Sequence, residues 1–536
     1  MPKRVELIIT IALVLIIVLL VLFKTSISKS IGSVLLISMY IILIGFLIFL
    51  FVNFKKIFCK IQKKTVLILA IIIICSLIIK LFIFPQFLGV YMDEVMRIDA
   101  ANNIALTDKA IICEPGFNKE FCEDIFVPIG WPFLMSLPIK IGFFSNSALI
   151  DYSIMIGVLN ILLIFFLVRL IFKNENFALL AAFIFAFDKL NLAWSISGND
   201  LNASIFFLLI STIAFFLFMK EQNLKSGLLF AFSFIFMIYI RTELLLIIIP
   251  FAAIFFAKRI SFKQNFKIPI LIILIFLIIL LLFMPTLAQT QKNFRHGDMA
   301  EELSTKETFL LQSKDILYRL VDSTYYSIFY IIIFAVGIIG MYSKFKKELL
   351  FLLTWLILFF IVYNVSNIKF IHKYYLVMFI PLIIIISYGF RYIYNYKSDS
   401  LKKNNWKVIR QVCTALVIIL ICSNVLPAFQ ESQNNRILLA KLPHLLEKDI
   451  EECYLLSGEA ILFSSITNIK AITASDFAAR EGEIINSLRG QCLLFFDDFY
   501  CDRGKGCDYI KDNYNPQPYL EYKNTREKYI IYKLEI

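Results

Sequence analysis

The chain has 536 residues, of which 60% are hydrophobic, and its formal net charge is +13. Its mean hydropathy is +0.80, and apolar runs of about 20 residues, long enough to span a bilayer, recur along it. These properties exclude a soluble globular protein and predict a polytopic α-helical membrane protein. The lysines cluster in short loops between apolar runs, which indicates membrane orientation rather than nucleic-acid binding.

The apolar runs predict about 13 transmembrane helices. The first run follows a short basic amino terminus and is long for the core of a cleaved signal peptide, so we interpret it as a retained signal anchor. With the amino terminus in the cytoplasm, nearly all the Lys- and Arg-rich connections fall on the cytoplasmic side, as the positive-inside rule requires. The predicted spans are 5–23, 31–53, 65–84, 148–171, 177–194, 200–219, 225–241, 243–257, 267–285, 326–342, 348–364, 374–393 and 410–427, and the cytoplasmic segments are 54–64, 172–176, 220–224, 258–266, 343–347 and 394–409.

This topology places three long segments together on the extracytoplasmic face: the loops 85–147 and 286–325 and the tail 428–536. Ionisable residues from distant parts of the sequence therefore converge at one membrane surface. We expect a multi-pass protein of the plasma membrane, with a cytoplasmic amino terminus and its carboxyl-terminal region outside the cell.

The tail 428–536 is less hydrophobic than the rest of the chain. Strand-like runs occur at 453–457, 460–465, 492–499 and 529–536, and a helix-like stretch covers 475–488. About a hundred residues suffice for a small domain. The tail is therefore predicted to be an extracytoplasmic α/β domain.

Six of the ten cysteines lie in segments predicted to be extracytoplasmic. Two are in the first outer loop and four are in the tail, and even numbers suit disulfides in an oxidising compartment. Cys113 and Cys122 form the obvious local pair, whereas the connectivity within the tail stays open. A zinc site is the disfavoured alternative, because the chain has only three histidines. The tail cysteines are Cys453, Cys492, Cys501 and Cys507.

Adjacent carboxylates, Asp93 and Glu94, follow closely on the span 65–84. Apolar positions at helical spacing predict an amphipathic helix over 93–105. The structural interpretation is that Asp93 caps this helix and Glu94 favours its dipole. The functional interpretation is a general base that takes the proton of an acceptor hydroxyl at the membrane surface. The two are compatible; Asp93 is the expected base and Glu94 its supporting neighbour.

Two arginines lie on the same predicted face. Arg241 ends the span 225–241, where it either snorkels or pairs with Glu243, or binds an anionic group of the substrate. Positive charge on the outer side runs against the orientation rule, which favours function. Arg97 stands one helical turn after Asp93 and is expected to pair with it, with substrate binding as the alternative.

Other polar residues mark the outer ends of spans. Asp200 begins the span 200–219, where helix capping is the simpler interpretation and a supporting role toward the acceptor is the alternative. His372, Lys373 and Tyr374 stand at the start of the span 374–393 and are candidates for binding an anionic ligand.

Four short motifs, in this order and on one face, resemble integral-membrane glycosyltransferases of the GT-C fold. The resemblance is specifically to the protein O-mannosyltransferases of glycosyltransferase family 39 and the lipid A aminoarabinose transferases. It covers about residues 65–393. The motifs are Asp93-Glu94, the Pro-rich stretch Val127-Pro128-Ile129-Gly130-Trp131-Pro132-Phe133-Leu134, Trp194-Ser195 with Asp200 and Phe206-Phe207, and Ile371-His372-Lys373-Tyr374-Tyr375 with Pro381.

The resemblance implies a GT-C-like transmembrane catalytic domain over 65–427, preceded in 1–64 by two additional transmembrane helices and a basic cytoplasmic loop. It implies inverting transfer of a hexose or pentose from dolichyl- or undecaprenyl-phosphate to a hydroxyl of a protein, lipid or glycan on the extracytoplasmic face. The departing lipid phosphate needs positive charge. Arg241, Arg97, His372, Lys373 and Tyr374 are therefore the expected donor-binding residues.

The sequence establishes no cofactor. A divalent metal ion is an alternative source of positive charge, although the sequence shows no clear metal-binding motif. Membrane lipids are expected partners and nucleic acid is not.

Two other functions compete with glycosyl transfer. A transporter or lipid flippase would place ionisable residues near the middle of the membrane, often with internal symmetry, whereas here they gather at the outer ends of spans and no repeat is evident. A non-catalytic sensor or assembly subunit would use the tail to bind a partner.

Overall fold

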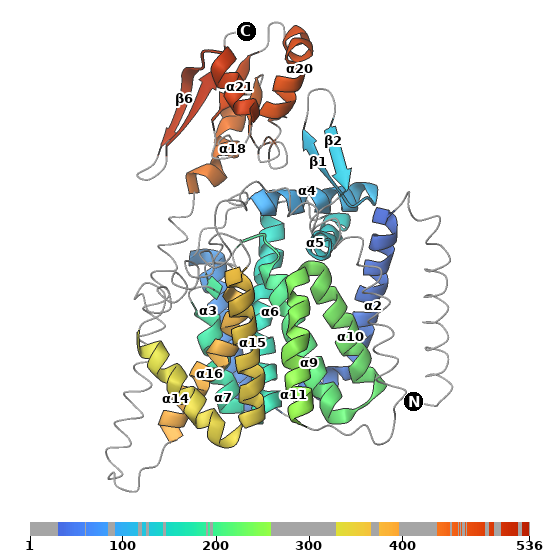
Figure 1. Ribbon diagram of the computed structural model, residues 1–536, viewed down its shortest axis with the longest axis vertical. Coiled ribbons are helices and arrows are strands. Elements are labelled where there is room, and N and C mark those ends of the chain that lie inside the picture. Colours follow the sequence, from blue (N-terminus) through green and yellow to red (C-terminus); the bar gives the residue numbers. More distant parts are fainter. Residues whose placement is uncertain are drawn as a thin grey trace.

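The computed structural model of the protein describes a helical bundle and, beyond one end of it, a five-stranded sheet (Figure 1). Within some described helices and strands individual side chains, that of Asp93 among them, are not described. The described residues are 31–58, 61–83, 92–115, 120–124, 128–142, 146–188, 191–192, 197–258, 328–365, 375–395, 437–450, 453–458, 460, 463, 467, 469–487, 492–497, 505–523 and 528–534.

Five helical segments in the described part are long and apolar enough to cross a membrane, namely Leu36–Phe54, Lys63–Ile83, Leu149–Phe172, Leu201–Glu221 and Leu376–Tyr394. The polytopic membrane character is thereby confirmed at the level of fold class. Ten predicted spans fall on described helices, while 5–23, 267–285 and 410–427 lie outside the described residues, so the count of 13 stays a prediction. The span predicted over 177–194 is shorter as a helix, which ends at Ala186.

The bundle consists of helices that run between its two ends. They are α2 (Ile31–Phe58), α3 (Lys63–Ile78) with its π-helical continuation η3 (Ile79–Ile83), α6 (Asn146–Phe172), α7 (Glu175–Ala186), α9 (Leu201–Glu221), α10 (Leu224–Ile240), the 3-10 helix η4 (Thr242–Ile247) with α11 (Ile248–Ala257), α14 (Ile328–Lys344), α15 (Lys346–Val365) and α16 (Tyr375–Asn395).

The helices differ in how much of their surface other helices cover. Nearly all of α9 is buried among its neighbours, and α10 packs against it along its length. By contrast, α2 and α3 expose large apolar side chains such as Phe51 and Leu67. Apolar side chains exposed in this way suit contact with lipid, since hydrocarbon imposes no cost on them. The bundle therefore has a protein-packed centre and a lipid-compatible periphery.

One helix lies across the end of the bundle that faces the sheet. This helix, α4 (Met92–Thr107), runs roughly perpendicular to the bundle helices (Figure 1) and packs on the short helix α5 (Gly130–Lys140). In the sequence between α4 and α5, the strands β1 (Ile111–Pro115) and β2 (Glu120–Asp124) form an antiparallel hairpin. The hairpin carries the Cys113–Cys122 disulfide, so the predicted local pair is confirmed.

The tail contains a mixed sheet with the strand order β4-β3-β5-β7-β6. Strands β4, β3 and β5 are parallel to one another, β7 is antiparallel to β5, and β6 is antiparallel to β7. Its elements are α18 (Ile437–Asp449), β3 (Tyr454–Ser457), β4 (Lys470–Thr473), α20 (Ala474–Ser487), β5 (Leu493–Phe496), α21 (Lys505–Asn513), β6 (Gln517–Lys523) and β7 (Lys528–Lys533).

The predicted strands near 453, 492 and 529 and the helix near 475 match described elements of this sheet. Strand β4 was not predicted, and the run at 460–465 is not a strand where it is described. Cys453 and Cys492 form a disulfide that joins the starts of two adjacent strands. Cys507 is also disulfide-bonded, and Cys501 lies outside the described residues. An extracytoplasmic location for the tail stays a prediction.

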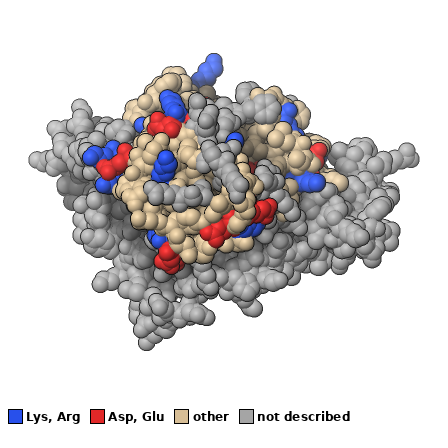
Figure 2. All heavy atoms as spheres, turned by 90° about the horizontal axis from the view of Figure 1, so that it is seen from above, with Lys and Arg blue, Asp and Glu red and all other residues tan. Residues whose placement is uncertain are grey.

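Acidic and basic side chains are intermixed on the face seen from above (Figure 2). In the tail several acidic and basic side chains form ion pairs, such as Lys528 with Glu521 at 3.0 Å and Lys511 with Asp497 at 2.8 Å. The described part of this face therefore does not gather the basic excess of the chain on one surface.

Candidate functional site

Two charged side chains of α4 are buried at the end of the bundle. Glu94 is 0% exposed and Arg97 is 8% exposed. They stand three residues apart on the helix and therefore share one of its faces. Val95 and Ile98, buried to the same degree, anchor α4 to the protein beneath it. The predicted amphipathic helix is thus present, and it carries charge into a protected place.

The charge of Arg97 meets a carboxylate from a distant part of the sequence. Its Nη2 atom lies 3.1 Å from Oδ2 of Asp200, at the start of α9. The same Oδ2 lies 3.9 Å from Nε of Arg241, at the end of α10. Arg241 also donates from Nε to Oε1 of Glu243 at 2.7 Å, and its Nη2 is 2.6 Å from that oxygen. We call these four residues the ion-pair network.

Hydrogen bonds fix the loop that carries Asp200. The indole of Trp131 in α5 donates to the carbonyl of Gly198 at 2.8 Å, and the hydroxyl of Ser153 in α6 donates to the carbonyl of Ser197 at 2.8 Å. The side chain of Asn199 accepts from the amide of Leu201 at 2.8 Å and so caps α9. Three elements therefore determine where the Asp200 carboxylate lies.

The capping interpretation of Asp200 is wrong. Its side chain makes no cap hydrogen bond to α9, because Asn199 has taken that place and the carboxylate of Asp200 turns to the two arginines. Arg97 has Asp200 as a described partner, and its expected pair with Asp93 stays a prediction because the Asp93 side chain is not described. Asp200 and Arg97 belong together, about a hundred residues apart in sequence.

A glycine allows α5 to approach α10 closely. A Cβ atom added to Gly130 would lie 2.7 Å from the carbonyl carbon of Tyr239 and 2.8 Å from the amide nitrogen of Ile240. Because Arg241 follows directly, this backbone contact sets the position of Trp131 relative to the arginine. The Pro-rich motif of the sequence thus acts here by positioning.

The ion-pair network keeps unused hydrogen-bonding capacity. Among the described residues none accepts a hydrogen bond from Nη1 of Arg97 or donates one to Oδ1 of Asp200, although both atoms are buried. A buried polar group without a partner is costly. Such atoms are suited to bind the polar groups of a ligand that enters the site.

Lys80 was not recognised from the sequence. It lies in η3 at the end of α3, is 0% exposed, and its amine has no hydrogen-bond partner among the described residues. The signal was present as a single cation inside a long apolar run, a pattern that marks a functional site by default in membranes.

The remaining predicted residues are placed as follows. The expected alternative in which Arg241 pairs with Glu243 is found, so its guanidinium already has an anionic partner. His372, Lys373 and Tyr374 lie outside the described residues, next to the start of α16. In the described part of the chain no three His, Cys, Asp or Glu side chains gather as a metal-binding group would.

Residues 127–288 match the family model described as dolichyl-phosphate-mannose-protein mannosyltransferase. No curated protein matches the chain in sequence.

Solved structures with the same fold include two membrane glycosyltransferases. The archaeal oligosaccharyltransferase AglB from Archaeoglobus fulgidus, in complex with an inhibitory peptide and a dolichol-phosphate, is 13% identical, with a TM-score of 0.55 over 87% of this chain and 74% of that one. ArnT from Cupriavidus metallidurans bound to undecaprenyl phosphate is 8% identical, with a TM-score of 0.52 over 88% of this chain and 98% of that one. Its apo form is 9% identical, with the same TM-score, over 87% and 97%.

The expected resemblance to GT-C membrane glycosyltransferases is thereby confirmed. At these identities the structural matches show the fold, and the family model covers the part of the chain that contains Asp200, Arg241 and Glu243.

Proposed function

We propose that the protein transfers a sugar from a polyprenyl-phosphate donor to an acceptor hydroxyl, with inversion at the anomeric carbon. The observation that carries this proposal is the buried group of acids and arginines at one end of the bundle. The side chains of Glu94 and Arg97 on α4 are buried, and Arg97 is joined through Asp200 to Arg241. The GT-C fold and the neighbours bound to dolichol-phosphate and undecaprenyl phosphate support a lipid-phosphate donor.

Asp93 is the proposed general base and Glu94 its supporting residue. Glu94 is fully buried, so an acceptor hydroxyl reaches it only if α4 moves. Glu94 lies with Arg97 inside the site, so its proposed role is to support Asp93, the neighbouring acid at the start of α4.

The proposed reaction is a single displacement. The carboxylate of Asp93 takes the proton of the acceptor hydroxyl as its oxygen forms a bond to the anomeric carbon. The bond from that carbon to the phosphate oxygen breaks at the same time, and the electron pair leaves with the polyprenyl phosphate. Charge thus accumulates on the phosphate, and cations in a poorly hydrated site stabilise it strongly.

Arg97 is the cation in the described part that we assign to this phosphate. Its Nη2 is held by Asp200 while Nη1 keeps a free hydrogen-bonding direction among the described residues. Arg241 is held by Glu243 and Asp200, so its proposed role is to position Asp200. His372, Lys373 and Tyr374, next to α16, are the further proposed donor contacts.

The test is a transfer assay on purified protein with radiolabelled polyprenyl-phosphate sugars and a panel of protein, lipid and glycan acceptors. Asp93→Asn is expected to lower turnover about 10²- to 10⁴-fold, the range that a positioned base contributes, with an unchanged melting temperature. Glu94→Gln is expected to lower it less.

Asp151→Asn is the matched control, because Asp151 is an exposed carboxylate on α6. It should transfer sugar like the wild type. Full turnover in both Asp93→Asn and Glu94→Gln would remove the acid pair from the mechanism. If no donor is consumed and a labelled solute instead crosses vesicle membranes, the protein is a transporter.

We further propose that the site faces the extracytoplasmic side, together with the tail. The orientation rule supports this placement, because the Lys-rich connections lie at the other end of the bundle. An accessibility assay on Cys introduced in α21, with intact cells and an impermeant thiol reagent, tests it.

A further inference from the structure

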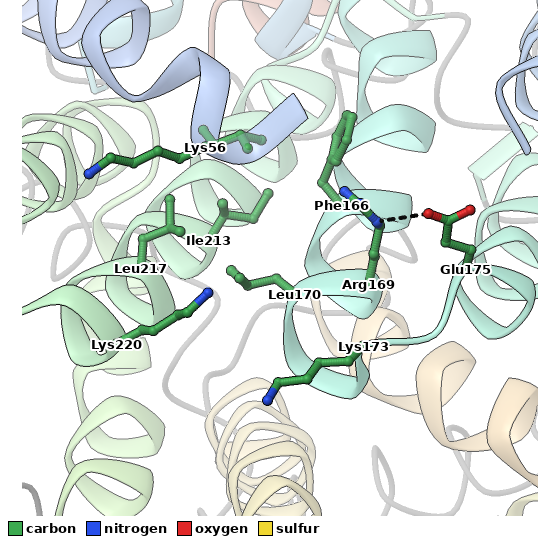
Figure 3. A pocket seen from close by; sticks show the side chains of 10 residues that line it. Lys56, Phe166, Arg169, Leu170, Lys173, Glu175, Ile213, Leu217 and Lys220 are labelled. Atoms are coloured by element: carbon green, nitrogen blue, oxygen red, sulfur yellow. Dashed lines mark ion pairs between the residues drawn. The ribbon is translucent and has the colours of Figure 1, made fainter. Parts of the chain in front are cut away.

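A polar cavity lies at the end of the bundle opposite to α4. It has a volume of about 360 Å³ and opens between the carboxyl-terminal ends of α2, α6 and α9. Its polar lining is almost entirely basic (Figure 3). The basic lining residues are Lys56, Arg169, Lys173 and Lys220.

Only part of this positive charge is neutralised by the protein. Arg169 lies 3.5 Å from Glu175, which also accepts a hydrogen bond from the hydroxyl of Thr65 at 2.7 Å. Lys56 pairs with Glu221. In the described part of the chain no carboxylate pairs with Lys173 or Lys220, so two of the four cations that line the cavity have no anionic partner there.

The walls between these cations are apolar. Ile57 from α2, Phe166 and Leu170 from α6, and Ile213 and Leu217 from α9 line the cavity, and Figure 3 shows Leu170, Ile213 and Leu217 between the basic side chains. A site for a small soluble anion needs no such walls. A charged rim over apolar walls, at the end of membrane-spanning helices, matches a molecule with a phosphate and an attached hydrocarbon portion.

The positive-inside rule and the helix dipoles explain why lysines occur at this end. They do not explain why four cations from three helices and a connecting segment surround one cavity, because the repulsion between like charges is weaker when they are spread over the surface. Basic pockets between transmembrane helices bind anionic lipid headgroups. The clustering of cations around this cavity therefore favours binding of an anionic ligand.

We propose that this basic cavity binds the phosphate headgroup of an anionic phospholipid from the membrane leaflet opposite to the glycosyl-transfer site. Lys173 and Lys220 contact the phosphate, Arg169 is held toward it by Glu175, and the apolar walls receive the start of the lipid tails. The inference is independent of the proposed function, since it involves neither α4 nor the ion-pair network.

The test measures binding of phosphatidylglycerol to the full-length protein in detergent, by native mass spectrometry and by the rise in melting temperature. The wild type is expected to bind it saturably and to ignore phosphatidylcholine and inorganic phosphate. The double variant Lys173→Gln/Lys220→Gln should bind about thirtyfold more weakly, because each cation near an anionic lipid contributes about 1 kcal/mol.

Lys346→Gln/Lys347→Gln is the matched control, since it removes the same charge from exposed residues at the turn between α14 and α15. It should bind like the wild type. Leu217→Trp keeps every charge but fills the cavity, and it should abolish binding.

Equal weakening in both double variants would overturn the proposal in favour of general surface attraction. Stabilisation by inorganic phosphate as strong as that by the lipid would replace it with a small-anion site. Undiminished lipid binding by Leu217→Trp would place the lipid elsewhere on the protein. Each variant is first checked for a wild-type melting temperature without added lipid, so that lost binding is distinguished from lost folding and the test does not depend on the proposed function.

Discussion

At the scale of single residues, Asp200 determines the site more than any other described group. It is 3% exposed and lies between Arg97 and Arg241. Replacing it with Asn should leave both guanidinium groups buried with less compensating charge. Removing one partner from a buried pair costs about 3–5 kcal/mol, so Asp200→Asn should lower the melting temperature markedly and also impair sugar transfer.

Thermal unfolding of the purified variant in detergent measures this effect, with Asp151→Asn as the control. A melting temperature of Asp200→Asn equal to that of the control would show that the carboxylate does not compensate the arginines. The comparison is sharp because both substitutions remove one carboxylate at the same end of the bundle.

Lys80 leads to an opposite expectation for stability. A buried cation without a hydrogen-bond partner in the described part is costly, and Met has a similar length without the charge. Lys80→Met should therefore raise the melting temperature by an amount corresponding to about 1–4 kcal/mol, while sugar transfer falls if the amine serves the donor. Lys64→Met, at an exposed position of the same helix, should change neither quantity. A lower melting temperature of Lys80→Met would reveal a stabilising partner.

At this scale the sequence identified the right residue types but only one of their pairings, that of Arg241 with Glu243. Asp93, Glu94, Arg97, Asp200, Arg241 and Glu243 were all candidates, and four of them meet in one network. Local rules assigned Asp200 to a cap and Arg97 to Asp93, because helix spacing is visible in a sequence and tertiary distance is not. Asn199, one position earlier in the chain, caps α9 instead of Asp200.

At the scale of elements, two glycines fix the crossing of α14 and α16. A Cβ atom on Gly337 would lie 2.2 Å from the carbonyl oxygen of Ile385, and one on Gly389 would lie 2.1 Å from that of Ile333. Small residues at such a crossing let two membrane helices approach closely. Gly337→Ala should force the helices apart and cost about 1–3 kcal/mol.

The melting temperature of Gly337→Ala in detergent checks this expectation. Gly482→Ala is the control, because no heavy atom lies within 4 Å of its added Cβ and Ala is favoured over Gly inside a helix. If Gly337→Ala melts at the same temperature as Gly482→Ala, then α14 and α16 can accommodate a Cβ atom at their crossing, and the expectation is wrong.

Elements that coincide with long apolar runs were predicted well. The span predicted over 148–171 is the helix Asn146–Phe172, and that over 200–219 is the helix Leu201–Glu221. Strand β4, Lys470–Thr473, has only four residues and shows no alternation that separates it from a loop. A long apolar run identifies a membrane helix because many consecutive positions agree, and it says little about which helices touch.

At the scale of the whole molecule, the two ends of the bundle carry different charge chemistry. The end below α4 buries acids with arginines, and the other end surrounds a cavity with cations. Charge counting along the loops predicted this asymmetry, because each loop belongs to one end or the other once the spans are known. The cavity itself requires three helices to meet and was not predictable.

The tail adds a region whose stability should depend on pH. Tyr509 and Tyr514 donate hydrogen bonds to the carboxylate of Glu481, and this lowers the pKa of Glu481 below its usual value of 4.5. A carboxyl whose pKa is lower in the folded state stabilises that state at higher pH, and the contribution disappears as pH falls through the lowered pKa. Protection of α20 and α21 from hydrogen exchange, corrected for the intrinsic exchange rate, should therefore decrease on acidification below about pH 4.5.

Glu481→Gln should have lower protection at neutral pH and a weaker dependence of protection on pH, whereas Asp512→Asn, at an exposed position of α21, should behave like the wild type. A wild-type acid dependence in Glu481→Gln would assign it to another carboxyl, and the contact between α20 and α21 would then not depend on this charge.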